Sequence, residues 1–239
     1  MAYINTSRGK LEYKEKVVFL GIKQINKEIS LENLKCVNQV LIKNKVKYGL
    51  MYGTLLGAVR EHDFITWDED IDLFVLSEDE EKLKDSIWDL QDYGFTMFRN
   101  DRDRTSIYSI SRNGEYIDFY IFEPYCKGIR SAGCNRKFFP DELLSNTVLC
   151  DFKGSKLRIP KDYSKLLEIE FGSNWMTPIQ YMNYEMSSIK KLLLRLKFYI
   201  RNSLPICVYI PLAKFKHRKN KKKVNEKLKM LGYQNLIVR

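Results

Sequence analysis

The sequence has little of what a secreted, disulfide-bonded or membrane-spanning protein needs. Its five cysteines are scattered and odd in number, which favours a reducing compartment over a disulfide framework. The first ten residues contain no apolar run that could serve as a secretory signal. The longest uncharged run of the basic C-terminal part, residues 202–213, has 12 residues, whereas a spanning helix needs about 20 apolar ones. We therefore expect a cytoplasmic protein without a transmembrane helix.

Zinc ligands are also scarce. The chain has two histidines, and His62 has no second ligand at metal-binding spacing, so we expect it to be a surface residue. Cys126, Cys134 and Cys150 lack the short paired spacings that are typical of structural zinc sites. The sequence therefore predicts no zinc centre.

The charge of the chain is distributed unevenly. Of the 41 lysines and arginines, 14 lie between Lys190 and Lys229 with a single acid, Glu226, which leaves 27 bases and 29 acids elsewhere. The chain has 239 residues, 44% of them hydrophobic, and can bury the core of one sizeable domain. We expect a near-neutral globular domain with a strongly basic C-terminal region.

Apolar patterns and turn signals predict a mixed α and β chain. The spacing between Val17 and Ile29 indicates a helix, so residues 1–30 are predicted to be a helical N-terminal segment, and Ser30 could cap a second helix. Ser77-Glu-Asp-Glu80 has the form of a capping box. Asn113-Gly114 is a strong signal for a type I′ hairpin. The predicted strands are residues 48–52, 71–76, 95–99, 105–112, 115–123, 147–152 and 156–159, with helices at 55–60, 77–93 and 163–171 and an irregular connection over 124–146.

One stretch combines a turn of small residues with an acidic strand. Glycine carries no Cβ, so the turn Gly53-Thr54 can bring backbone N–H groups close to an anion. Asp68, Asp70 and Asp72 follow at alternate positions, which share one face of a strand. Carboxylates so close repel each other unless a cation lies among them, and single hard oxygen ligands suit Mg²⁺ or Mn²⁺. The stretch therefore predicts a metal and phosphate site.

A third carboxylate comes from a later strand. Asp118 lies inside Tyr-Ile-Asp-Phe-Tyr-Ile, where an acid is costly unless it is paired or bound to a metal. The alternative is an edge strand with Asp118 facing water. Taken with the glycine turn, the set of Asp70, Asp72 and Asp118 favours the metal. Phosphoryl transfer gains most from such positioned cations, and Asp118 would hold a second ion or accept the proton of an attacking hydroxyl.

Three neighbours of this set have two interpretations each. Asp68 could share the site, but we favour a hydrogen bond to a loop N–H. Arg60 could contact phosphate or form a salt bridge to a nearby acid. Trp67 could stack on a base or sugar, although core packing is the commoner use of such a ring.

The residues that form this stretch resemble a known family. Tyr-Gly-Thr-Leu-Leu-Gly-Ala-Val-Arg from Tyr52 to Arg60, and Phe-Ile-Thr-Trp-Asp-Glu-Asp-Ile-Asp from Phe64 to Asp72, are similar to the LicD family, which is related to fukutin. Its usual pattern is G-T-L-L-G-A-V-R, a short gap and F-I-P-W-D-D-D-I-D. The resemblance extends from about residue 31 to 178. The departures are Thr66 for proline, Glu69 for aspartate, and Glu61-His62-Asp63 in a gap that is usually basic or contains glycine.

The resemblance implies a nucleotidyltransferase-like fold in residues 31–180, a mixed sheet flanked by helices. It implies transfer of a phospho-alcohol, such as phosphocholine or ribitol phosphate, from a CDP-linked donor to a hydroxyl of a glycan or lipid-linked oligosaccharide. CMP would leave, a divalent metal would be required, and the product would be a modified surface polysaccharide or glycolipid. Carried over residue by residue, the resemblance assigns the following roles: phosphate binding to Gly53 and Thr54, metal binding and catalysis to Asp70, Asp72 and Asp118.

The C-terminal region, residues 181–239, needs its own interpretation. Residues 190–216 mix apolar and basic side chains, and residues 214–223 add a polybasic cluster. An amphipathic basic segment of this kind can lie on an anionic membrane surface. Nucleic-acid binding is the competing interpretation, and a solvated helix with a disordered tail is the third. We favour a peripheral position on the cytoplasmic face of the membrane, because apolar residues precede the cluster.

Two other functions fit the same residues. The carboxylates could serve a nucleotidyltransferase that uses an NTP and releases pyrophosphate. Alternatively, the chain could be a non-catalytic basic protein that binds membrane or nucleic acid, with an inactive acidic site. Assays for CMP and pyrophosphate separate the two enzymes, and an intact set of carboxylates argues against the binding protein.

Overall fold

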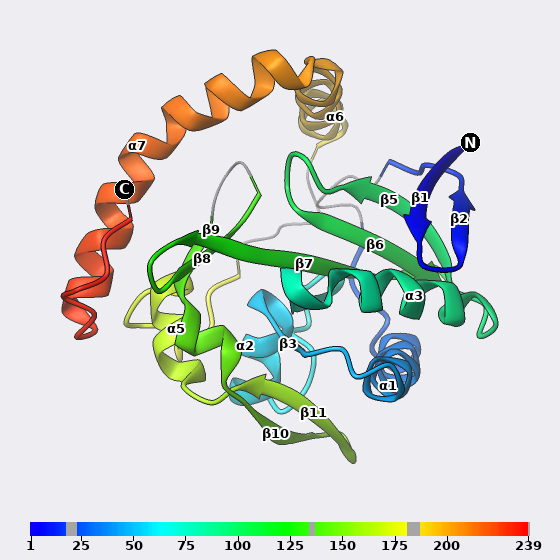
Figure 1. Ribbon diagram of the computed structural model, residues 1–239, viewed down its shortest axis with the longest axis horizontal. Coiled ribbons are helices and arrows are strands. Elements are labelled where there is room, and N and C mark those ends of the chain that lie inside the picture. Colours follow the sequence, from blue (N-terminus) through cyan, green and yellow to red (C-terminus); the bar gives the residue numbers. More distant parts are fainter. Residues whose placement is uncertain (18–22, 134–136, 181–186, 239) are drawn as a thin grey trace.

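The computed structural model describes residues 1–17, 23–133, 137–180 and 187–238. Its centre is a seven-stranded mixed sheet that helices flank (Figure 1). Five strands form a continuous path in the order β3-β4-β7-β6-β5, and β8 and β9 extend it from the end of β7. The strands of this sheet are β3 (Tyr48–Leu50), β4 (Ile71–Leu76), β5 (Thr96–Asp101), β6 (Ile107–Arg112), β7 (Glu115–Cys126), β8 (Ile129–Ala132) and β9 (Lys137–Pro140).

The pairing of β4 with β7 is parallel, and the other pairs of this sheet are antiparallel. All six residues of β4 are buried, as expected of a central strand covered on both faces. The predicted Asn113-Gly114 hairpin is confirmed: both residues have positive φ, 53° and 82°, and join β6 to β7 in register. The fold is therefore the predicted α+β architecture.

Helices cover the sheet and bring the site stretch to it. The helices of the central domain are α1 (Lys27–Lys43), α2 (Tyr52–Arg60), α3 (Glu80–Gln91), α4 (Asp141–Ser145) and α5 (Tyr163–Phe171), with a 3₁₀ turn η1 (Ser77–Asp79) before α3. Helices α1 and α3 pack on each other and contact β7 and β4 respectively, while α2 packs on β4 and α5. The apolar residues of these elements form one continuous core. The core thus fixes α2 against the strand that carries Asp72.

The N-terminal residues contradict the prediction of a helical segment. Residues 2–13 form an antiparallel hairpin of β1 (Ala2–Thr6) and β2 (Gly9–Tyr13). Its apolar residues alternate, so Ile4, Leu11 and Tyr13 share the buried face. Ser7 anchors the hairpin to α3 by donating to Asp85 from its backbone N–H at 3.1 Å and its hydroxyl at 2.6 Å. The predicted helix at 17–29 lies partly outside the described residues.

Two predicted helix starts are also corrected. Helix α1 begins four residues earlier than Leu31, because the Asn26 side chain accepts from the N–H of Ile29 at 3.1 Å and caps it there. Ser77 and Glu80 do not form a capping box. Glu80 instead accepts from Arg102 at 2.9 Å and from the Tyr108 hydroxyl at 2.7 Å. Glu80 therefore bonds to residues distant in the sequence, where a capping box would have paired it with Ser77.

The connection predicted to be irregular contains β8, β9 and α4. Gly128, with φ of 72°, makes the turn from β7 into β8. The Arg130 guanidinium then donates to both carboxylate oxygens of Glu78 at 2.7 Å and also pairs with Asp141. These contacts hold β8 and β9 beside the start of α3.

The remaining elements follow the prediction more closely. Strands β10 (Thr147–Phe152) and β11 (Ser155–Pro160) form the second hairpin, and α5 ends at Gly172, whose φ is 97°. Two helices, α6 (Ser188–Ser203) and α7 (Ile206–Met230), make up the basic extension. None of the helices in the described ranges combines the length and hydropathy needed to cross a bilayer.

Candidate active site

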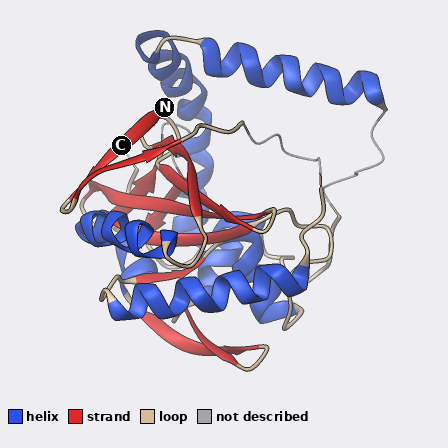
Figure 2. Cartoon of the chain, turned by 90° about the vertical axis from the view of Figure 1, so that its right-hand side faces the viewer, coloured by secondary structure: helices blue, strands red, loops and turns tan. Residues whose placement is uncertain are grey.

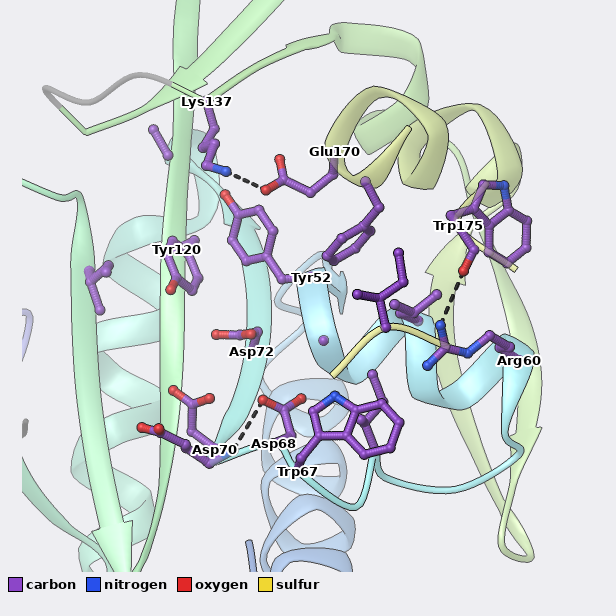
Figure 3. A pocket seen from close by; sticks show the side chains of 18 of the residues that line it. Tyr52, Arg60, Trp67, Asp68, Asp70, Asp72, Tyr120, Lys137, Glu170 and Trp175 are labelled. Carbon is purple, nitrogen blue, oxygen red and sulfur yellow. Dashed lines mark hydrogen bonds and ion pairs between the residues drawn. The ribbon is translucent and has the colours of Figure 1, made fainter. Parts of the chain in front are cut away.

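A cavity of about 730 Å³ opens between the sheet and helices α2 and α5 (Figure 3). One side is acidic and comes from the segment before β4 and from β4 and β7. The opposite side comes from β9, α5 and residues 174–179. The predicted site residues that line the cavity are Gly53, Arg60, Trp67, Asp68, Asp70 and Asp72.

The three predicted carboxylates come together on the sheet. Asp72 on β4 and Asp118 on β7 are register partners in the parallel pair, so both side chains leave the same face of the sheet. Asp70 lies just before β4. Each of the three carboxylates offers an oxygen within 4.8 Å of the others, and Asp72 and Asp118 are buried. The structure therefore excludes the alternative in which Asp118 faces water from an edge strand.

A polar row across the sheet holds Asp118 in place. Arg99 on β5 pairs with Ser109 on β6, and Ser109 with Asp118 on β7. The Ser109 hydroxyl donates to Asp118 Oδ1 at 2.6 Å, and Arg99 Nη2 donates to Asp118 Oδ2. Arg99 also donates to Ser109 from Nε at 2.7 Å. Both oxygens of Asp118 thus have a partner within the sheet.

Asp70 and Asp72 carry more negative charge than the described side chains around them neutralise. Burial raises the pKa of Asp70 well above its usual value, and the charge of Asp118 adds to the effect. Burial likewise raises the pKa of Asp72, followed by the charge of Asp70, although a hydrogen bond from Tyr120 works against the rise. Arg99 offsets part of this charge. A cation among the carboxylates would favour the ionised forms.

The first turn of α2 is tied to Asp72 by two hydrogen bonds. The N–H of Met51 donates to Asp72 O at 2.9 Å, and the N–H of Asp72 donates to Thr54 Oγ1 at 2.9 Å. Thr54 is fully buried, and its side chain does not line the cavity. Its hydroxyl therefore positions α2 against β4, and the prediction that Thr54 binds substrate now depends on its backbone N–H alone. Gly53 and Thr54 form the helix's first turn, where a separate turn had been predicted.

Gly53 is needed for a close approach. A Cβ at this position would lie 2.2 Å from Asp68 Oδ2. Asp68 Oδ1 in turn accepts from the N–H of Glu69 at 3.0 Å, as predicted for a structural role. Burial raises the pKa of Asp68 to about 6, although that hydrogen bond lowers it. Asp68 combines the structural contact with a place in the cavity wall.

Arg60 and Trp67 form the structural contacts that were predicted as alternatives to substrate binding, and both residues also line the cavity. Arg60 Nε donates to Glu61 at 2.9 Å, and its Nη1 donates to the carbonyl of Trp175 at 3.1 Å. Trp67 is half-buried and packs against the core while lining the cavity. Figure 3 shows Trp67, Arg60 and Trp175 on the same side of the cavity. His62 is exposed, as expected.

The opposite wall contains residues that the sequence did not single out. Lys137 and Glu170 form an ion pair there, and the Lys137 ammonium lies 5.4 Å from the centre of the Tyr52 ring. The Tyr52 hydroxyl is buried and has no hydrogen-bond partner among the described residues. Tyr52 also packs edge-on against Tyr120, with ring centres 4.8 Å apart. This wall can offer an ion pair to a ligand, and the buried Tyr52 hydroxyl lies beside it (Figure 3).

Only some of these site residues could have been predicted from the sequence. The Asn113-Gly114 turn fixes the register of β6 and β7, and so places Ser109 opposite Asp118. Arg99 follows only if a further strand pairs with β6. Lys137 and Glu170 come from separate elements, and no local pattern brings them to Tyr52.

Comparison with known proteins gives matches in the same region. A family model described as LicD/FKTN/FKRP, nucleotidyltransferase domain, matches residues 45–162. An uncharacterized protein of Rickettsia prowazekii (strain Madrid E) is 39% identical over 72 residues, which are 30% of this chain and 27% of that protein. Ribitol 5-phosphate transferase FKRP of Homo sapiens is 30% identical over 171 residues, 66% of this chain and 34% of the human protein.

The chain spans between 27% and 34% of the length of the curated relatives it matches. Among solved structures, the lincomycin-bound lincosamide antibiotic adenylyltransferase LnuA is 14% identical with a TM-score of 0.43, over 72% of this chain and 96% of that chain. The family match contains Gly53, the three carboxylates and both strands that carry them.

Proposed function

Residues 45–162 form a nucleotidyltransferase domain of the LicD/FKTN/FKRP family, and from this premise we propose that the chain is a phospho-alcohol transferase. The proposed reaction moves a polyol phosphate or phosphocholine from a CDP-linked donor to a glycan hydroxyl and releases CMP. The transferase FKRP, matched over 171 residues, makes CDP-ribitol the first donor to test.

The carboxylate set supports a divalent metal. Asp70, Asp72 and Asp118 gather within 4.8 Å of one another, and their oxygens are the hard ligands that Mg²⁺ or Mn²⁺ prefers. The burial that raises the pKa of Asp70 and Asp72 makes their charges costly without a counter-ion. We propose these three residues as the ligands. A bound ion would neutralise developing charge on the phosphate oxygens.

Asp118 is better suited to this role than to accepting a proton. Ser109 and Arg99 already donate to its two oxygens, and each oxygen keeps a further lone pair for a ligand. The guanidinium of Arg99 forms an ion pair with this carboxylate. We therefore propose that the row from Arg99 to Asp118 orients a ligand carboxylate.

The start of α2 supports phosphate binding. The early N–H groups of a helix have no partner within it and point toward an anion at its N-terminus. Gly53 lies in this turn and lines the cavity, and its lack of a Cβ allows the backbone to stay close. Arg60, one helix length away on the same side of the cavity, could neutralise a second anionic group.

The two ends of the cavity suit different parts of a donor. Trp67 and Trp175 present flat rings near Arg60, which suits a nucleoside. Lys137 and Glu170 present a charged pair on the opposite wall, with the buried, unpartnered Tyr52 hydroxyl next to it among the described residues, which suits the hydroxyls of a polyol or acceptor sugar. We propose that the first end binds the nucleotide and the second selects the hydroxylated group.

The register that sets Asp72 beside Asp118 is the observation that carries this proposal. The test incubates the protein with CDP-ribitol, CDP-glycerol or CDP-choline, with acceptor glycans, and measures CMP in Mg²⁺, Mn²⁺ or EDTA. We expect metal-dependent CMP release with one donor. Pyrophosphate release from an NTP would instead identify a nucleotidyltransferase, and no reaction or metal-dependent binding with any donor would contradict both.

A further inference from the structure

Helices α6 and α7 are covered to different extents. Helix α7 buries Tyr209, Ala213, Val224 and Leu228 and packs against α5. Every side chain that the structure describes on α6, by contrast, is exposed. Figure 2 shows α6 along the top of the molecule, apart from the strands. The fold therefore buries part of the apolar surface of α7, whereas the described side chains of α6 stay exposed.

The exposed apolar residues of α6 form a stripe. At about 100° per residue, six of them fall within one third of the helix circumference. These six residues, the α6 stripe, are Ile189, Leu192, Leu193, Leu196, Tyr199 and Ile200, each at least 52% exposed. Leu194 is also exposed, at 43%, but it lies on the opposite side of the helix. A stripe of this size on one surface helix indicates an interaction site.

The charges around the stripe identify what it contacts. Helix α6 carries five lysines or arginines in its sequence and no acid. Arg195 and Lys197 fall on either side of the stripe. A protein partner or a second copy would have to supply matching acids, and a second α6 would repel the first. An anionic lipid surface supplies the negative charge and the apolar layer together.

The length of α6 fixes how it would lie. Its 16 residues extend about 24 Å, which is less than the roughly 30 Å of a bilayer's hydrocarbon core. The helix can therefore lie in the plane of the interface, with the stripe among the acyl chains and the basic residues reaching the headgroups.

We propose that α6 is an in-plane membrane helix that binds an anionic lipid surface through the α6 stripe. This inference goes beyond the proposed reaction and does not depend on it. The junction between α6 and α7 is held to the domain, because Arg104 donates to the carbonyl of Leu204 at 2.9 Å and its guanidinium lies 5.4 Å from the Tyr209 ring. The next residue, Thr105, lines the cavity. Membrane binding would thus bring the cavity close to the lipid surface.

Cosedimentation of the full chain with vesicles tests the proposal. The vesicles contain phosphatidylcholine alone or with phosphatidylglycerol. We expect binding to the vesicles with phosphatidylglycerol, weakened by salt because headgroup attraction is screened. The key variants are Leu196→Glu, in the centre of the stripe, and Leu194→Glu, two residues away on the other side. Both side chains are exposed, and far-ultraviolet circular dichroism checks that both variants fold.

We expect Leu196→Glu to lower the partition coefficient at least about tenfold and Leu194→Glu less than about twofold, because only the first position enters the acyl region. Equal losses of vesicle binding in the two variants would overturn the proposal. So would a wild-type chain that does not bind anionic vesicles. A dimer that Leu196→Glu dissociates, without vesicle binding, would assign the stripe to a second copy. Gel shifts with RNA or DNA but no vesicle binding would assign the helix to nucleic acid. Either result contradicts a lipid surface.

Discussion

The two walls of the cavity differ in how far their acidic side chains are balanced by basic ones. On the sheet side, which we call the acidic wall, Asp70 and Asp72 line the cavity. The buried Asp118 lies behind them, within 4.8 Å of both, and accepts from Arg99. On the opposite side, Lys137 and Glu170 form a one-to-one pair. We propose that the acidic wall takes up a cation from outside, because its acids outnumber its bases, and that the opposite wall, whose charges balance, recognises neutral hydroxyls. The contrast separates the chemistry of the site from its selectivity.

The largest effect is expected from removing a charge of the acidic wall. Asp72→Asn should lower turnover at least about a thousandfold, since a lost metal ligand costs several kcal/mol of transition-state stabilisation. In EDTA the same variant should unfold at higher denaturant concentration than the wild type, because it removes a costly buried charge. CMP release and urea unfolding measure the two effects. Turnover retained in Asp72→Asn would show that the ligand assignment is wrong.

Removing the guanidinium of Arg99, which pairs with Asp118, should lower stability, whereas Asp72→Asn in EDTA should raise it. Arg99→Met leaves Asp118 buried without its charged partner, and should reduce the free energy of unfolding by about 3 kcal/mol. Arg99→Lys keeps the charge and is the matched control. If urea unfolding gives the same free energy for Arg99→Met as for the wild type, the row across the sheet does not hold Asp118.

An alanine at Gly53, in the first turn of α2, tests the proposed phosphate contact. The Cβ in Gly53→Ala would lie 2.2 Å from Asp68 Oδ2, so Asp68 or the first turn of α2 must move. A displacement of about 1 Å can cost on the order of a hundredfold in turnover. Gly114→Ala, at a turn with open space for a Cβ but strained by positive φ, should lower stability with little change in turnover per folded molecule. Similar turnover in the two variants would contradict phosphate binding at Gly53.

On the opposite wall, beside Lys137 and Glu170, Tyr52→Phe removes a buried hydroxyl that has no partner among the described residues. Stability should stay the same or rise slightly, since no hydrogen bond within the protein is lost. If the hydroxyl binds the donor or acceptor, KM for that substrate should rise about five- to tenfold while kcat changes less. Steady-state kinetics with each substrate varied in turn measures the split. An unchanged KM for both the donor and the acceptor would show that the Tyr52 hydroxyl binds neither substrate.

The smallest effect concerns a paired charge away from the cavity. Arg130 holds the pKa of Glu78 at about 2, below its ordinary value of 4.5. The pair's contribution is therefore fully present above pH 4.5 and is lost as the pH falls from 4.5 toward 2. The Glu78 side chain is 56% exposed, so solvent screening should keep this contribution below about 1 kcal/mol. The unfolding free energies of wild type and Glu78→Gln should differ at pH 7 and converge near pH 2; a constant difference would contradict the pair.

The sequence was most informative where local signals determine structure. The buried run from Ile71 to Leu76 and the Asn113-Gly114 turn predicted two central strands and the pairing of β6 with β7. The parallel pairing of β4 with β7, which sets Asp72 beside Asp118, was not predicted. The sequence was least informative where distant contacts override local ones. Glu80 has the place of a capping residue but binds Arg102 and Tyr108 instead.

The site follows the same rule. The acids were found because a buried carboxylate is conspicuous in an apolar strand. Thr54 was predicted to bind phosphate, but its hydroxyl accepts from the N–H of Asp72 and is buried, a contact that the sequence pattern does not predict. Nothing in the sequence around Lys137 or Glu170 marks either residue as part of a site. They line the cavity together because the fold brings β9 close to α5.

The central claim is that the acidic wall holds a divalent cation. Electron paramagnetic resonance of Mn²⁺, titrated into the wild type and into Asp72→Asn, measures this without any assumption about the substrate. The account predicts bound Mn²⁺ in the wild type, displaced by Mg²⁺, and a strong loss of binding in the variant. Equal binding by the two proteins, or no binding by the wild type, would contradict it.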